Sequence, residues 1–141
     1  MKSFLLPAAV LAAAAFLAGG CGHLDIQAEG NPDRVITGTV NFHLDEPLPP
    51  DSELSVRLVD TSNGAGAPLP LGEQTIKNPG SPPVAFNFEY HAEDAQLQHG
   101  LNLEARVSIG GKLRYYNVSG YAVTLSKADQ PQEVWITPVG N

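Results

Sequence analysis

The chain has 141 residues, which is enough for one domain and leaves little room for a second. Its 15 acidic and 8 basic residues give a formal net charge of −7, and no basic run occurs along the sequence. This disfavours a nucleic-acid partner and attachment to acidic lipid by charge, because both need a basic surface. The single cysteine, Cys21, excludes an internal disulfide bond.

Residues 1–20 have the pattern of a secretory signal peptide. Lys2 supplies an early positive charge, residues 4–17 are almost wholly apolar, and Ala18-Gly19-Gly20 precede Cys21. The apolar segment is short and rich in alanine, whereas a membrane-spanning helix needs about 20 strongly apolar residues. LAGGC has the character of a bacterial lipobox, with alanine where leucine is commoner. We therefore expect the Cys21 thiol to carry a diacylglyceryl group and to become the mature N-terminus.

Lipidation gives the lone cysteine a purpose, since an exposed free thiol is a liability in an oxidising compartment. In enterobacteria, an aspartate directly after the lipidated cysteine favours retention in the inner membrane. This chain has Gly22 at that position, so the outer membrane is the expected destination. Residues 21–33 then form a polar tether, broken by Gly30 and Pro32. Loss of the signal removes Lys2 and leaves 7 basic against 15 acidic residues, a formal charge of −8.

The rest of the chain, residues 34–141, reads as one all-β domain. Apolar and polar residues alternate in short runs that are separated by Gly- and Pro-rich breaks. About seven to eight strands in about 105 residues predict a compact β-sandwich or a small barrel. The expected strands cover residues 34–44, 53–60, 73–77 (weak), 84–91, 101–109, 112–118, 121–125 and 133–139.

Three connections have clear signals of their own. Gly110-Gly111 lies between two strand-like runs, which predicts a two-residue hairpin turn. Residues 92–99 (AEDAQLQH) can form at most a short helical turn. Residues 61–72 (TSNGAGAPLPLG) are expected to form a long turn.

We expect no catalytic residue, metal site, cofactor or small-molecule substrate. His91, Glu93, Asp94 and His99 fall in one connection, but their spacing does not match a helical metal-binding pair, so they are better explained as solvated loop residues. The adjacent acids Asp45-Glu46 and Glu93-Asp94 are likewise neighbours in turns rather than carboxylates facing each other across a cleft. No nucleophile elbow, phosphate-binding loop or dinucleotide fingerprint occurs. The sequence therefore predicts a protein that is not an enzyme.

Four aromatic residues near the C-terminus leave two interpretations open. Tyr115, Tyr116, Tyr121 and Trp135 can be core or cross-strand residues, or they can form an exposed binding platform. The first interpretation is the commoner one on the face of a sandwich.

Several segments together resemble the YbaY family of bacterial lipoproteins, which is related to the YscW-type pilotins of type III secretion. The segments are ITGTV, LPPDSELSVRLVD, PVAFNFEYHAEDAQ, LEARVSIGGKLRYYN and VWITPV, and the resemblance spans Val35 to Val139. The most specific element is L-P-P-D followed by an alternating strand and Asp60. The resemblance implies a compact β-sandwich that is anchored by lipid in the outer membrane and faces the periplasm.

The same resemblance implies a function, because pilotins escort a secretin to the outer membrane and help it to assemble as a ring. Two hypotheses follow: a non-catalytic binding module for a secretin subunit or another envelope protein, or a structural or stress-related envelope lipoprotein without dedicated cargo. The resemblance brings no catalytic residues and assigns no residues that contact a partner.

Overall fold

The structure is a computed structural model, and it describes residues 32–62, 68–117 and 120–140. Residues 1–20, Cys21 and the tether up to residue 31, about which the sequence makes predictions, lie outside the described residues. One short helix, α1 (Asp94–His99), accompanies the strands. The strands are β1 (Asp33–Asn41), β2 (Ser52–Asp60), β3 (Leu69–Lys77), β4 (Val84–His91), β5 (Leu101–Ile109), β6 (Lys112–Tyr116), β7 (Ala122–Val123), β8 (Gln132–Trp135) and β9 (Thr137–Pro138).

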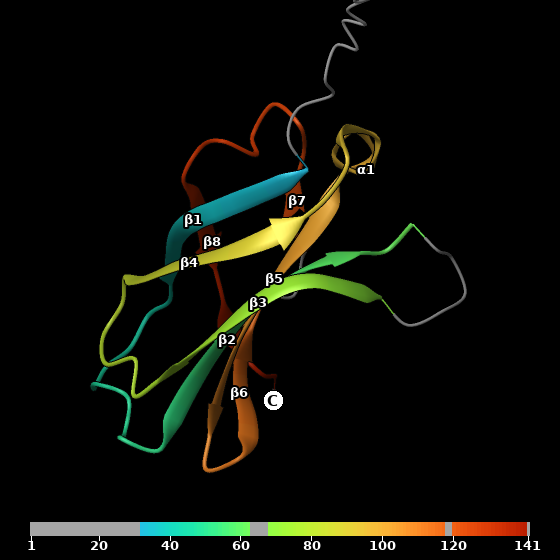
Figure 1. Cartoon of the computed structure of the whole chain (residues 1–141). Helices are drawn as coiled ribbons and strands as arrows, with labels where there is room; N and C mark the ends of the chain where they lie inside the picture. The colour runs from blue at the N-terminus through green and yellow to red at the C-terminus, as the bar shows by residue number, and fades with distance from the viewer. Residues whose placement is uncertain (1–31, 63–67, 118–119, 141) are drawn as a thin grey trace, which may run out of the picture.

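The strands form two sheets, and the all-β fold expected from the sequence is confirmed as a sandwich (Figure 1). The smaller sheet has the order β4-β1-β8, with β1 antiparallel to β4 and parallel to β8. The larger sheet has the order β3-β2-β5-β6-β9, and β7 pairs with β5. The chain enters the domain at the start of β1, close to α1, while the β5–β6 hairpin lies at the opposite end (Figure 1).

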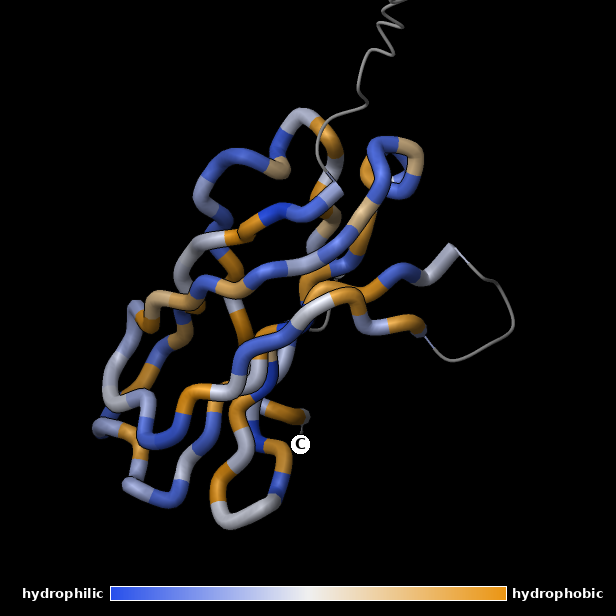
Figure 2. The backbone as a smooth tube through the Cα atoms, in the orientation of Figure 1, coloured by the Kyte–Doolittle hydropathy of each residue, from blue (hydrophilic) through white to orange (hydrophobic). Residues whose placement is uncertain are grey.

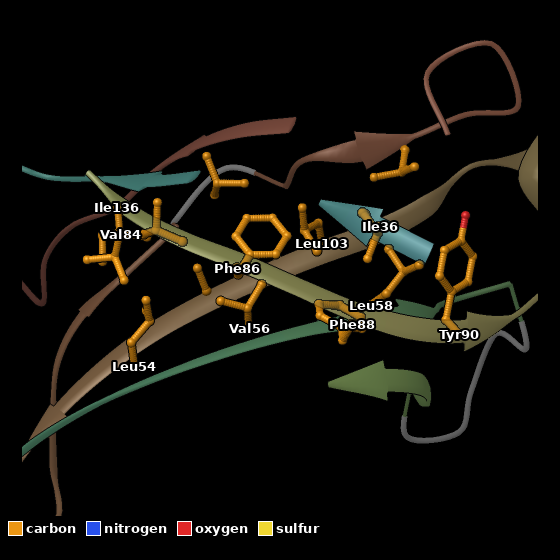
Figure 3. Close-up of a cluster of buried hydrophobic side chains, with 14 of the residues drawn as sticks. Ile36, Leu54, Val56, Leu58, Val84, Phe86, Phe88, Tyr90, Leu103 and Ile136 are labelled. Atoms are coloured by element: carbon orange, nitrogen blue, oxygen red, sulfur yellow. The ribbon is translucent and has the colours of Figure 1, made fainter. Parts of the chain in front are cut away.

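The core lies between the sheets and is filled by alternate apolar residues of the strands. Figure 2 shows how hydrophobic and hydrophilic residues alternate along the chain. In β4, Val84, Phe86, Phe88 and Tyr90 are buried and the residues between them are exposed, as the sequence predicts. Figure 3 shows the aromatic rings of β4 against aliphatic side chains of both sheets, such as Leu58 from β2. Because successive side chains point to opposite faces of a strand, this alternation allows one face of each sheet to be buried while the other stays in contact with water.

The hairpin turn at Gly110-Gly111 is also confirmed. Both glycines have positive φ angles, 57° and 84°, as a two-residue turn of the kind favoured between antiparallel strands requires. Residues with a Cβ atom adopt two such angles in succession only at a cost, so the glycine pair fixes where β5 ends and β6 begins.

Several strand boundaries differ from the sequence prediction. The strand expected at residues 121–125 is reduced to β7 (Ala122–Val123), and the strand expected from residue 112 ends at Tyr116. β3 is a full nine-residue strand that begins at Leu69, inside the expected turn. β1 ends at Asn41, so His43 lies beyond the strand and is exposed. The predicted strand 133–139 divides at Ile136 into β8, in the smaller sheet, and β9, in the larger one.

Candidate binding surfaces

The connection between β4 and β5 holds the histidines and acids considered as a metal site. His91 Nδ1 lies 2.9 Å from Asp33 Oδ1, and His91 Nε2 lies 3.8 Å from Glu93 Oε1. Asp94 instead forms an ion pair with Arg34. Over the described ranges, no three histidine, cysteine, aspartate or glutamate side chains are grouped so that they could hold a metal ion. Of these side chains, His91 and Asp94 attach the connection to β1, through Asp33 and Arg34.

Arg34 closes the end of the sandwich beside this connection. Its Nε donates a hydrogen bond to the carbonyl oxygen of Ala92 at 3.2 Å, and its guanidinium pairs with Asp94 at the start of α1. Both partners are 58 or more residues away along the chain, so the strand fixes the position of the helix. Arg34 therefore holds α1 and the connection before it against β1, and its guanidinium is paired within the domain.

Asp60, the last residue of β2, is buried at the centre of a second network. Its Oδ1 accepts hydrogen bonds from Ser62 Oγ at 2.6 Å and from Ser62 N at 2.9 Å, and its Oδ2 accepts one from Gln96 Nε2 at 3.0 Å. The hydrogen bonds from the Ser62 side chain, the Ser62 backbone and Gln96, in that order, lower the pKa of Asp60. Gln96 Oε1 in turn accepts from Glu93 N at 2.9 Å, so Asp60 supports the first turn of α1.

The Asp60→Asn substitution is expected to destabilise the fold by about 1–2 kcal/mol at neutral pH, because the amide places a donor opposite Gln96. The depressed pKa fixes the sign of the pH dependence: the unfolded chain binds the Asp60 proton more readily. The contribution of Asp60 is therefore fully present above its ordinary pKa of about 3.9 and is lost as pH falls through the lower folded value.

Urea unfolding between pH 2.5 and pH 7 measures this effect. The gap in free energy of unfolding between wild type and Asp60→Asn should shrink below about pH 4. Exposed Asp45 provides the control, and Asp45→Asn should leave the free energy within about 0.5 kcal/mol at every pH. A gap that stays constant down to pH 2.5 would contradict the role of the Asp60 carboxylate.

The four aromatic residues take different positions, and in the described part of the chain no ring contact joins any two of them. Tyr115 is half-buried and packs against the core residue Phe42, with ring centroids 5.6 Å apart. The Tyr121 hydroxyl donates to Gln132 Oε1 at 3.0 Å. Tyr116 is half-buried on the larger sheet, whereas Trp135 on β8 is 50% exposed. Of the four, Trp135 is the one that presents a largely exposed ring.

The outer surface of the smaller sheet is open to solvent. We call it the open face, and it consists of the outward residues of the three strands. Nine of these eleven side chains are exposed, and Thr39 and Asn41 are half-buried. The members are Asp33, Val35, Thr37, Thr39 and Asn41 of β1, Ala85, Asn87, Glu89 and His91 of β4, and Glu133 and Trp135 of β8.

Two hollows lie along the open face, one after the other on β1. The first has a volume of about 640 Å³, and Thr37, Thr39 and Ala85 are among the small side chains that line it. The second has a volume of about 520 Å³ and includes Val35 and Glu89. The first lies over residues 37–39 of β1 and is also lined by Gln74, Asn87 and Glu133, whereas the second lies over residues 33–35 and is also lined by Arg34.

The outer surface of the larger sheet differs because Glu104 is paired there with Arg57 across strands and with Arg106 along β5. Arg57 Nε lies 2.6 Å from Glu104 Oε2, and the Arg106 guanidinium lies 3.9 Å from the same oxygen. Arg57 and Glu104 are directly opposite in the register of β2 and β5. Such a cross-strand pair gives charged side chains on a solvated sheet surface partners within the domain itself.

A third surface lies at the β5–β6 hairpin, and we call it the hairpin groove. It has a volume of about 600 Å³ and combines exposed apolar residues with basic ones. Its lining includes Ile109, Lys112, Leu113, Arg114, Tyr115, Pro138 and Val139. The β5–β6 hairpin, whose residues line much of this groove, lies at the end of the sandwich away from the start of β1 (Figure 1).

The chain is a small β-sandwich with hollows on the open face and at the hairpin groove. Residues 31–135 match the family described as type III secretion system lipoprotein chaperone (YscW). The match covers well over half of the chain, and the chain belongs to this family. The YscW part of the resemblance seen in the sequence is thereby confirmed, and the family is one of chaperones.

The fold also matches a solved structure, which is described as an alternative pilotin from the type II secretion system of Vibrio cholerae. The two chains are 22% identical, with a TM-score of 0.64 over 77% of this chain and 99% of the other. At this identity the likeness shows a shared fold. No curated protein sequence matches the chain. Within the residues that the structure describes, no helix has the length and apolar character needed to cross a bilayer.

Proposed function

We propose that this protein is an outer-membrane lipoprotein of the pilotin type, which binds a secretin subunit of a type III secretion system. The lipid anchor would carry the bound subunit to the outer membrane, where the secretin assembles as a ring. The observation that carries this proposal is the match of residues 31–135 to a family of type III secretion lipoprotein chaperones. The pilotin fold of the solved neighbour, which serves a type II system, supports the same class of role.

The sequence before the sandwich supports the anchor. In this proposal residues 1–20 are removed, Cys21 is acylated, and residues 21–33 tether a domain of residues 34–141 that faces the periplasm. Each buried methylene of an acyl chain contributes about 0.8 kcal/mol, and two or more chains hold a protein stably at a membrane. Gly22 supports sorting to the outer membrane.

The surface chemistry supports holding a partner rather than transforming one. His91 lies beside Asp33 and Glu93, Asp94 pairs with Arg34, and the carboxylate of Asp60 supports a helix. The exposed apolar residues Val35 and Trp135 lie on a sheet surface that offers contact area.

Within the family, we further propose a kinship with the YbaY lipoproteins. The sequence segments that resemble them cover β1, β2, β4, the β5–β6 hairpin and the end of the chain. The most specific of them is L-P-P-D followed by an alternating strand and Asp60; in the structure that strand is β2, and Asp60 is buried.

The Cys21→Ser variant tests the proposed function in cells that contain the secretin. Without the thiol no diacylglyceryl group can be attached, so we expect the protein to leave the membrane fraction and secretin rings to be lost from the outer membrane. Sucrose-gradient fractionation and immunoblots of the heat-resistant secretin multimer measure both effects. His23→Ser, two residues further along the tether, is the matched control and should behave as wild type.

Secretin rings that reach the outer membrane in normal amount with Cys21→Ser would contradict the pilotin role. The protein level of each variant must match wild type by immunoblot, so that loss of rings reports on anchoring rather than on degradation.

A further inference from the structure

We propose that the hairpin groove is a second membrane contact of this protein, which rests on the phospholipid surface beside the acyl anchor and binds its anionic headgroups. This inference rests on the lipid anchor of the proposed function and goes beyond it, because it gives the folded domain a membrane contact of its own and hence an orientation. Three observations carry it: the unpaired cations of the groove, its exposed apolar side chains and the acidic charge of the opposite end.

The cations of the hairpin groove have no acidic partner in the described part of the chain. Lys112 and Arg114 are exposed on β6, and no carboxylate among the described residues forms an ion pair with either. Arg34, Arg57 and Arg106, by contrast, each pair with a carboxylate. The groove therefore presents two unpaired positive charges in a chain whose formal net charge is −7, and it favours an anionic partner.

The hollows of the open face have a different charge. Glu133 lines the first, and Glu89 lines the second together with Arg34. The described lining of the hairpin groove, by contrast, includes neither aspartate nor glutamate. Carboxylates repel an anionic surface, so of these three hollows the groove is the one suited to contact it.

Exposed apolar side chains adjoin the cations of the groove. Leu113, which lies between Lys112 and Arg114 in the sequence, is 39% exposed, and Val139 is also 39% exposed. The backbone N–H of Val139 donates a hydrogen bond to the carbonyl oxygen of Arg114 at 2.8 Å, so Val139 lies beside β6. Apolar groups beside lysine and arginine suit a phospholipid surface, because the apolar groups enter the headgroup region while the cations contact phosphates.

The opposite end of the sandwich, where the chain enters β1, is acidic (Figure 1). The side chain of Asp33 is 81% exposed and that of Glu93 is 51% exposed. Arg34 is paired there with Asp94, and His91, which lies beside both exposed acids, is charged only when it is protonated. An anionic leaflet repels this end and attracts the groove, so both effects favour the same orientation.

The tether is long enough for this orientation. β5 runs from Leu101, beside α1, to Ile109 at the hairpin, eight residues or about 27 Å at about 3.4 Å per residue. The twelve residues from Gly22 to Asp33 span at most about 40 Å when fully extended. The acylated Cys21 can therefore lie in the bilayer while the hairpin groove contacts its surface.

The groove needs little affinity of its own. The acyl chains hold the domain at the bilayer, and a short tether keeps the groove at an effective concentration in the millimolar range. Each lysine or arginine near an anionic leaflet favours the contacting orientation by about fivefold, so two favour it by about 25-fold. The chain as a whole is acidic and has no basic run, so the groove orients an anchored domain rather than recruiting a free one.

A fluorescent label on a single cysteine tests the inference with the mature lipoprotein in vesicles. Acylated Cys21 has no free thiol and the chain has no other cysteine, so Val139→Cys, in the groove, or Gln98→Cys, exposed on α1, accepts one environment-sensitive dye. The vesicles consist of phosphatidylcholine, with or without phosphatidylglycerol in place of a quarter of it. We expect the dye at position 139 to report an apolar environment in the vesicles with phosphatidylglycerol, and the dye at position 98 to remain in water.

Neutral substitutions make the comparison quantitative. Lys112→Gln and Arg114→Gln should each lower the ratio of membrane-contacting to water-exposed dye at position 139 by about fivefold. Leu113→Asn should lower it as well. Lys127→Gln is the matched control, because it removes one exposed positive charge from the turn that contacts α1, and it should leave the ratio unchanged. Thermal unfolding of each purified variant verifies that the sandwich remains folded.

The inference is overturned if the dye at position 139 remains in water, if the dye at position 98 reports the apolar environment instead, or if the signal is as strong with phosphatidylcholine alone. Insensitivity to Lys112→Gln and Arg114→Gln would also overturn it. A signal that rises with the ratio of protein to lipid would assign the groove to a second copy of the chain.

The outcome is separate from that of the proposed function. Because the vesicles contain no secretin, a contact at position 139 upholds the orientation whatever partner the protein binds, and its absence from an acylated protein leaves the pilotin role intact. Mass spectrometry of the purified protein shows whether Cys21 is acylated, and an unmodified thiol would refute both the anchor and the inference.

Discussion

Gly38→Ala is expected to cost more than about 3 kcal/mol of folding free energy, a large part of the total stability of a small domain. A Cβ atom at this position would lie 2.3 Å from the Gln132 carbonyl oxygen and 2.8 Å from Phe86 Cζ. The first clash is with backbone, which cannot rotate away. Gly38 is opposite Gln132 in the β1–β8 register, so relief of the clash requires the two strands to separate.

Urea unfolding followed by far-UV circular dichroism measures this change, and Gly140→Ala is the matched control. A Cβ on Gly140 meets nothing within 4 Å, so the control should unfold within about 0.5 kcal/mol of wild type. If the free energy of unfolding of Gly38→Ala also lies within about 1 kcal/mol of the wild-type value, then β1 and β8 are not as close as the structure shows.

Leu58→Ala is expected to destabilise the sandwich by about 2–5 kcal/mol. Leu58 is 0% exposed in the middle of the core, where β2 is paired on both sides by β3 and β5. Removal of its terminal carbons loses burial of apolar surface and leaves a cavity that paired strands cannot collapse to fill.

Leu69→Ala is the control for this substitution, because Leu69 lies on the neighbouring strand β3 and is 50% exposed. Its truncation should change the free energy of unfolding by less than about 0.5 kcal/mol. Equal losses from the two leucines in chemical denaturation would show that the core is not where the structure places it.

Much of the fold could be predicted because alternation of apolar and polar residues reports directly on burial. β4 and β5 were predicted with their observed bounds, since each has an unbroken period of two. β3 was underestimated because Pro70 resembles a turn residue. The structure shows that Pro70 lies on an edge strand, opposite Val59 and beside a register shift, where a missing backbone donor is tolerated.

The division of the C-terminal strand could not be predicted from its own residues. Ile136 donates its backbone hydrogen bond to the carbonyl oxygen of Asn41, and the chain then moves from the smaller sheet to the larger one. The parallel pairing of β1 with β8 joins segments more than 90 residues apart, as the pair Gly38 and Gln132 illustrates. Local patterns contain no information about which distant segment supplies such a partner.

The open face was predictable only in part. Alternation shows which residues point outward, so Val35, Thr37 and Trp135 could be placed on a surface. Whether outward charges find partners depends on the register between strands, which pairs Arg57 with Glu104 but gives Glu133 no basic neighbour on its own sheet face. The sequence therefore could not show on which sheet face the charged side chains are paired with each other and on which they are not.

The support of α1 by Asp60 was also missed, although its residues were visible. Glu93 and Gln96 are spaced as a helix N-terminus requires, but Asp60 is 36 residues away from Gln96. Asp60 ends the sequence element that begins with L-P-P-D, and its hydrogen bonds to Ser62 and Gln96 give the physical reason for a carboxylate at this position.

The pilotin role is best measured by affinity purification of the full-length protein from detergent-solubilised membranes of cells that express a type III secretin. If the protein is a lipid-anchored pilotin, the secretin should co-purify in a ratio close to one subunit per lipoprotein, as measured by quantitative mass spectrometry. If the lipoprotein is recovered from those membranes without the secretin, the account is contradicted, and an envelope lipoprotein without dedicated cargo becomes the better description.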